Sequence, residues 1–193
     1  MNWETIMTLG DSITIGARSV LGYPEYCGDF LASKTAKNWN VVNHAVSGYT
    51  SIDLCRSVTQ NFVNLQSFKP EVITILVGTN DLKKNISLED FQIAYKQLII
   101  KSRLIIRNSN IILLQIPELM QGVMLPYSIS MNQNLKKYND IIEDLASQMG
   151  IMTEKFDAKP EHFYDGVHLN DSGCKIWGEQ LGNFVLNHRF LNE

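Results

Sequence analysis

The chain has 193 residues and a formal net charge of −3, with 45% hydrophobic and 19% charged residues. This length fits a single well-buried domain over residues 1–193 and is short for two domains, and the composition excludes a disordered or fibrous protein. The small negative charge provides no basic surface for a nucleic acid, and no apolar run reaches the roughly 18 residues of a membrane span. We therefore expect neither nucleic-acid binding nor integral membrane association.

The cysteines and the first residues bear on the cellular compartment. Cys27, Cys55 and Cys174 are odd in number and lack the spacing of a metal site, which predicts free thiols in a reducing environment. The chain begins Met-Asn-Trp-Glu, without the basic and apolar regions of a signal peptide. These features predict a cytoplasmic protein.

Short β-rich apolar runs alternate with longer segments of helical pattern. The runs that resemble buried strands are residues 5–9, 41–45, 72–77 and 111–116. Residues 151–156 are more polar and are interpreted as an edge strand. Strict alternation of strands and helices predicts a parallel sheet with helices on both faces, a three-layer α/β/α sandwich.

Capping residues and apolar spacing predict five longer helices. The first spans about residues 24–37, and the next two begin at Thr50 and Ser87, each of which precedes an aspartate by three residues as an N-cap does. The fourth carries an apolar stripe over residues 135–149 and stops at Gly150. The fifth runs from about Ser172 to the C-terminus.

The loop after the fourth strand, residues 117–127, is long, apolar and broken by two prolines. It carries Leu119, Met120 and Met124, and methionine packs adaptably at binding surfaces. One interpretation is a simple cover for the sheet edge. The other is a flexible wall over an acyl pocket.

Four polar clusters follow predicted strands or precede the last helix. They are Gly10-Asp11-Ser12, the segment from Asn43 to Gly48, Gly78-Thr79-Asn80-Asp81, and Asp165-Gly166-Val167-His168. In open α/β sheets, ligands bind where the carboxyl ends of the strands meet. These clusters are therefore expected to share one site.

Their residue types match the needs of acyl transfer, which are a nucleophile, a base, an orienting carboxylate and N–H donors for an oxyanion. Ser12 can be the nucleophile, His168 the base and Asp165 its orienter. The backbone N–H groups of Ser12 and Gly48 and the side-chain amide of Asn80 can be the donors. Glycine at position 48 keeps the approach of a substrate carbonyl free.

Other residues receive structural interpretations. Gly10, Asp11, Gly78 and Asp81 are expected to support the two turns. His162 is the rival base, but no aspartate stands three residues before it. Scattered histidines do not favour a metal site.

The four clusters resemble the blocks of the SGNH hydrolases, also called the GDSL esterase and lipase family, in the right order from about residue 5 to 175. Gly10 to Thr14 resembles the first block, with Ile13 in place of the commoner leucine, and His44 receives no role. The resemblance implies a flavodoxin-like sheet of order 2-1-3-4-5. It also implies hydrolysis of a small carboxylic ester, with a short-chain acyl or acetyl group, or of a thioester, through an acyl-serine and without cofactor or metal.

Two alternatives use the same residues differently. A carbohydrate- or lipid-binding module would carry a silent triad, and an acyltransferase would accept an alcohol in place of water. The sequence leaves the natural substrate and the oligomeric state open.

Overall fold

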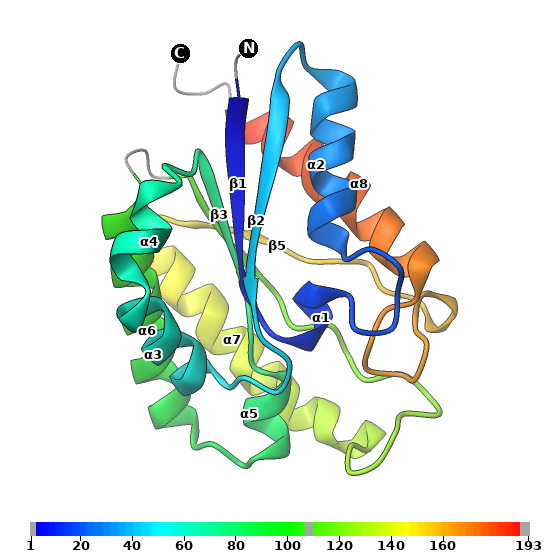
Figure 1. Ribbon diagram of the computed structural model, residues 1–193. Coiled ribbons are helices and arrows are strands. Elements are labelled where there is room, and N and C mark those ends of the chain that lie inside the picture. The colour runs from blue at the N-terminus through cyan, green and yellow to red at the C-terminus, as the bar shows by residue number, and fades with distance from the viewer. Residues whose placement is uncertain (1–2, 107–109, 190–193) are drawn as a thin grey trace.

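The β-rich runs of the sequence form one parallel sheet in the computed structural model, which describes residues 3–106 and 110–189 (Figure 1). The strand order is β2-β1-β3-β4-β5, and every neighbouring pair is parallel, which confirms the predicted topology. The strands are β1 (Trp3–Gly10), β2 (Asn38–Ala45), β3 (Val72–Leu76), β4 (Ile111–Leu114) and β5 (Met152–Glu154). The last two are shorter than the predicted segments that contain them, residues 111–116 and 151–156.

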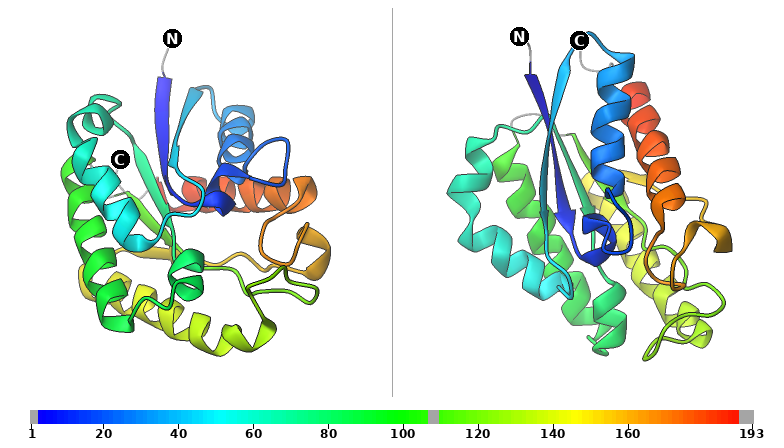
Figure 2. Two further views of the ribbon diagram at one scale, coloured as in Figure 1. Left: turned by 60° about the horizontal axis from the view of Figure 1, so that its bottom comes forward. Right: turned by 45° about the vertical axis from the view of Figure 1, so that its right-hand side comes forward.

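Helices cover both faces of this sheet, so the predicted three-layer architecture is also confirmed (Figures 1 and 2). One face carries α2 (Tyr23–Lys34) and α8 (Asp171–Arg189). The other carries α3 (Ser51–Gln60), α4 (Phe62–Ser67), α6 (Leu88–Ile105) and α7 (Asn132–Met149). The expected extension of the last helix to the C-terminus falls on residues 190–193, outside the described residues.

Four short helical elements are too short for apolar periodicity to predict. α1 (Ser12–Ile15) and α5 (Thr79–Lys83) follow β1 and β3, and two 3-10 helices, Ile129–Met131 and Pro160–His162, lie in the segments that lead to α7 and α8. Within the described residues, no helix is long and apolar enough to cross a membrane.

The central strands β1 and β3 are mostly apolar, with Thr8 and Thr74 as buried exceptions, because both of their faces are covered. In β1, Ile6 packs into the core between the sheet and helices α2 and α8, whereas Met7 and Leu9 pack into the core between the sheet and helices α3 and α6. The same alternation occurs in β3, where Ile73 and Ile75 take the second side. Side chains of a strand point alternately to its two faces, so one continuous apolar run serves two cores.

Three predicted helix boundaries are confirmed by their capping contacts. Thr50 and Asp53 form a capping box at the start of α3, with both reciprocal bonds at 3.2 Å. The Ser87 hydroxyl accepts a hydrogen bond from the backbone of Asp90 at 3.0 Å. Gly150 ends α7 in the left-handed conformation.

Trp177 of α8 is the largest fully buried side chain of the core beside α2. Its indole stacks on Tyr23 at 4.5 Å and on Phe156 at 5.1 Å, and its N–H donates to Glu154 at 3.1 Å. We expect Trp177→Ala to lower the free energy of unfolding by about 3–5 kcal/mol, through a cavity and a carboxylate left without this donor.

Urea unfolding measures this effect, and Trp3→Ala is the matched control because Trp3 is 59% exposed. Equal losses for the two variants would contradict the assignment of Trp177 to the core.

Candidate active site

The parallel register brings the predicted site residues to one edge of the sheet. Gly10 at the end of β1 pairs with Ala45 of β2 and with Leu76 of β3, so the three strands end side by side. Ser12 begins α1 directly after β1, and Asn80 lies in α5 directly after β3. The polar clusters therefore meet at the carboxyl edge, as expected for an α/β sheet.

Asp11 shapes the turn that presents Ser12. Its Oδ1 accepts a hydrogen bond from the backbone N–H of Ile13 at 3.0 Å and so caps α1. Ser12 is 7% exposed, and the turn leaves its hydroxyl facing His168.

His168 joins Ser12 to Asp165. Its Nε2 lies 3.0 Å from Ser12 Oγ, and its Nδ1 lies 2.8 Å from Asp165 Oδ2. Asp165 Oδ1 accepts from the backbone N–H groups of His168 at 2.8 Å and Val167 at 3.1 Å. With a carboxylate at Nδ1, that nitrogen carries the proton and Nε2 can accept one from serine.

The pKa of Asp165 is lower than that of an ordinary aspartate. Partial burial alone would raise it, but hydrogen bonds from the backbone and ring of His168 and from Val167 outweigh the burial. The carboxyl therefore stays ionised beside the imidazole.

Arg18 adds a positive charge beside this carboxylate, with its Nε 3.6 Å from Asp165 Oδ2. The sequence carries no local signal for this ion pair, since Arg18 lies in the loop between α1 and α2.

Gly48 lies in the turn after β2 with φ of +83°, a conformation that disfavours other residues. A Cβ at this position would meet no heavy atom within 4 Å, so the backbone here borders open space. Glycine is thus favoured here by the backbone conformation and not by a close contact with other protein atoms.

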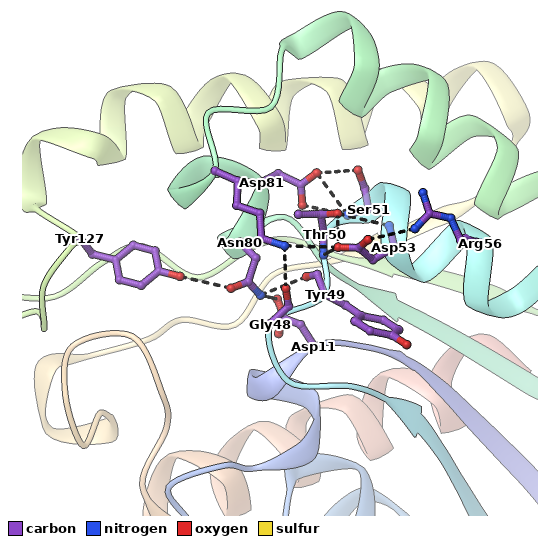
Figure 3. Close-up of polar contacts among 11 residues, drawn as sticks. Asp11, Gly48, Tyr49, Thr50, Ser51, Asp53, Arg56, Asn80, Asp81 and Tyr127 are labelled. Carbon is purple, nitrogen blue, oxygen red and sulfur yellow. Dashed lines mark hydrogen bonds and ion pairs between the residues drawn. The ribbon is translucent and has the colours of Figure 1, made fainter.

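Asn80 is 7% exposed and makes polar contacts at both ends of its amide (Figure 3). Its Nδ2 donates to the Tyr49 carbonyl at 3.0 Å and to Asp11 Oδ2 at 3.3 Å. Its Oδ1 accepts from the Tyr127 hydroxyl at 3.5 Å. The amide nitrogen therefore faces the Asp11 turn and the loop that contains Gly48.

Asp81, next to Asn80, was expected to support its own turn, and it also binds the start of α3. Its carboxylate accepts from the backbone N–H of Ser51 at 2.9 Å and from the Ser51 hydroxyl at 2.6 Å (Figure 3). Gly78 precedes α5 as its N-cap residue. Together they fix α5 against the start of α3.

The residues suggested as an acyl-pocket wall differ in their exposure. Leu119 is buried in the core below α6 and α7, whereas Met120 is half-buried and Met124 is 39% exposed. Met120 lines a cavity of about 150 Å³ together with Pro117 and Phe156. Burial thus leaves Met120 and Met124 as the members of the predicted wall with accessible surface.

The remaining histidines of the sequence analysis have structural partners. His162 Nδ1 accepts from the backbone of Lys159 at 3.1 Å, and its ring stacks on Phe156. His44 Nε2 lies 3.0 Å from the Ser57 hydroxyl. Across residues 3–106 and 110–189, no group of three or more histidine, cysteine or acidic side chains is placed to hold a metal ion.

Asp11 is 1% exposed, and burial raises its pKa to about 7, while the bond from Ile13 opposes the shift and the Asp81 charge adds to it. An unfolded aspartate titrates near pH 4. Between these two pH values Asp11 keeps a proton in the folded chain that it has lost in the unfolded chain. The contribution of Asp11 to the free energy of unfolding is therefore fully present below about pH 4 and is lost as the pH rises through about 7.

We expect the free energy of unfolding of Asp11→Asn, relative to that of the wild type, to rise by up to about 4 kcal/mol between pH 4 and 8. Urea unfolding across this range measures the difference, and a constant difference would contradict the raised pKa.

A family model of the GDSL-like lipase/acylhydrolase family matches residues 8–176. The chain belongs to this family. The match includes Ser12, Gly48, Asn80, Asp165 and His168, and it confirms the resemblance drawn from the four clusters.

Individual relatives agree with this assignment. A multidomain esterase from Ruminococcus flavefaciens is 26% identical over 93% of this chain, which spans 28% of the length of that relative. The crystal structure of the lipase/acylhydrolase from Enterococcus faecalis has a TM-score of 0.77 at 17% identity, with 95% of this chain and 96% of the other covered. An acetyl xylan esterase variant from Geobacillus stearothermophilus has a TM-score of 0.70 at 19% identity, covering 91% of each chain. The structural similarities establish a shared fold.

Proposed function

We propose that this protein is a serine esterase that cleaves small carboxylic esters through an acyl-serine. The observation that carries the proposal is the continuous chain from Ser12 Oγ through His168 to Asp165, at 3.0 and 2.8 Å. A serine hydroxyl is a weak nucleophile until a base takes its proton, and an imidazole held by a carboxylate is suited to do so.

In the proposed reaction, Ser12 Oγ bonds to the ester carbonyl carbon as its proton passes to His168 Nε2. The carbonyl electron pair moves to oxygen and returns when the bond to the alkoxy group breaks. The departing alcohol takes the proton from His168. Water then attacks the acyl-serine, gives a proton to His168, and releases the acid as Ser12 regains its hydrogen.

The oxyanion of this reaction would lie beside the start of α1 and the open turn at Gly48. The backbone N–H groups of Ser12 and Gly48 and the Asn80 amide are its proposed donors. In the resting site, Nδ2 of Asn80 donates to Tyr49 and Asp11, so the oxyanion would replace one of these acceptors. The hydrogen bond to Asp11, at 3.3 Å, is the longer of the two, and we expect it to break when the oxyanion forms.

We expect Asn80→Ala to lower kcat about a hundredfold or more, because one preorganised donor is lost where charge develops. Ester hydrolysis under saturating substrate measures this loss. A variant that keeps wild-type kcat would remove Asn80 from the oxyanion hole.

The chain length of the acyl group is tested by hydrolysis of p-nitrophenyl esters from acetate to decanoate, with Ser12→Ala as the control. A sharp preference for acetate would place this chain beside the acetyl xylan esterases among its structural neighbours. A maximum at longer chains would support Met120 and Met124 as an acyl-binding wall. Absence of Ser12-dependent turnover for every ester would overturn the proposal.

A further inference from the structure

The loop of residues 117–127 is bonded to the turn that carries Asp165. The backbone N–H of Met120 donates to the Gly166 carbonyl at 2.9 Å, and that of Met124 donates to the Asp165 carbonyl at 3.1 Å. Gly166 admits this approach because a Cβ there would lie 2.7 Å from Val123 Cα. One side of the loop is thus fixed to the backbone beside the acid of the triad.

The other end of the same loop reaches Asn80 through Tyr127 (Figure 3). The Tyr127 backbone N–H donates to the Met124 carbonyl at 3.0 Å, which continues the connection from Asp165. Its ring is 6% exposed, with Lys83 Nζ 5.8 Å from the ring centroid. Its hydroxyl donates to Asn80 Oδ1 at 3.5 Å.

An asparagine amide has nearly the same shape at both ends, so its direction depends on its hydrogen bonds. Only Nδ2 can donate to an oxyanion, and a flipped amide would present an oxygen to it. The acceptors on Nδ2 favour the productive direction in the resting site, and the Tyr127 hydroxyl, which donates to Oδ1, would still favour it once an oxyanion replaces one of those acceptors. Burial raises the pKa of Tyr127 to about 12, and the charges of Asp11 and Asp165 add to this shift, so the hydroxyl keeps its proton at neutral pH.

We propose that Tyr127 is a positioning residue that fixes the direction of the Asn80 amide, and that the 117–127 loop links this amide to the Asp165 turn. The proposal rests on the proposed esterase function, because it assigns Asn80 its donor role. It gives the loop a part in catalysis that does not require contact with an acyl chain.

The test variant is Tyr127→Phe, which keeps the buried ring and removes only the hydroxyl. We expect kcat for p-nitrophenyl acetate to fall about three- to tenfold, the usual range for a single neutral hydrogen bond, with KM little changed. Tyr95→Phe is the matched control, since Tyr95 is also buried and its hydroxyl donates to the Ile75 backbone carbonyl at a similar 3.4 Å. This control is expected to keep wild-type kcat.

A double-mutant cycle separates positioning from general support of the fold. In an Asn80→Ala background, Tyr127→Phe should cause no further loss of kcat, because the amide that it orients is gone. Wild-type kcat in Tyr127→Phe, or the same fold loss in both backgrounds, would overturn the inference while Ser12-dependent hydrolysis by the wild type still supports the esterase. Absence of that hydrolysis would instead overturn the proposed function itself.

Discussion

Replacement of Ser12 by alanine is expected to lower kcat for ester hydrolysis by about four orders of magnitude or more. The hydroxyl is the only group of Ser12 that changes, and its oxygen lies 3.0 Å from His168 Nε2. Without it no acyl-serine can form, and only the residual effect of binding and of the oxyanion donors would remain. Single-turnover and steady-state hydrolysis of p-nitrophenyl acetate measure the loss.

Ser57→Ala is a matched control for this variant. The Ser57 hydroxyl also lies 3.0 Å from a histidine nitrogen, that of His44, and it is 8% exposed. Its loss should leave kcat unchanged. A fluorophosphonate should label the wild-type chain and the Ser57 variant but not the Ser12 variant. Equal labelling of all three would show that another residue is the nucleophile.

The sheet could be predicted from the sequence because its signals are local. A run such as Val72–Leu76 is buried throughout and apolar except for Thr74, since both faces of the sheet are covered, and the next strand follows after a helical pattern. The caps at Thr50 and Ser87 were readable for the same reason, since each depends on a residue three positions away. Strand ends were less certain, because β4 and β5 are both shorter than the segments 111–116 and 151–156 that predicted them.

The short helices and the side-chain network of the site could not be read in this way. α1 and α5 have too few residues for an apolar stripe, and their positions depend on capping by Asp11 and on the contact of Asp81 with Ser51. The bond from Tyr127 to Asn80 joins residues 47 positions apart on different elements. Such contacts follow from the packing of the whole fold and have no fixed spacing in the sequence.

The predicted site residues nevertheless lie together, because the sheet topology brings residues that are far apart in the sequence to one edge. Ser12, Gly48 and Asn80 follow three strands that are neighbours in the sheet and end in register. The 165–168 turn reaches them from the far end of the chain, with its Asp165 and His168 already paired locally. The direction of the strands thus predicted where the clusters that follow them meet, whereas the orientation of each side chain required the structure.

Asp165→Asn is expected to lower kcat about ten-thousandfold while leaving the chain folded. Asparagine can keep an oxygen at the Oδ1 position, where it would still accept from the backbone N–H groups of His168 and Val167. Its amide nitrogen would replace the oxygen that lies 2.8 Å from His168 Nδ1. Because that nitrogen donates, the ring must move its proton to Nε2, and Nε2 could then no longer accept the proton of Ser12.

The measurement is kcat for p-nitrophenyl acetate together with the urea midpoint of unfolding. The Arg18 side chain of the lost ion pair is half-exposed, so this pair contributes little to stability and the midpoint should move only slightly. Asp171→Asn is the control, since Asp171 also accepts a backbone hydrogen bond, from Val20 at 2.6 Å, but has no histidine partner in the proposed triad. If Asp165→Asn kept a tenth or more of wild-type kcat, the tautomer of His168 would not depend on this carboxylate, and another acceptor would have to hold Nδ1. A large loss confined to Asp165→Asn would instead assign the carboxylate the orienting role that its 2.8 Å contact suggests.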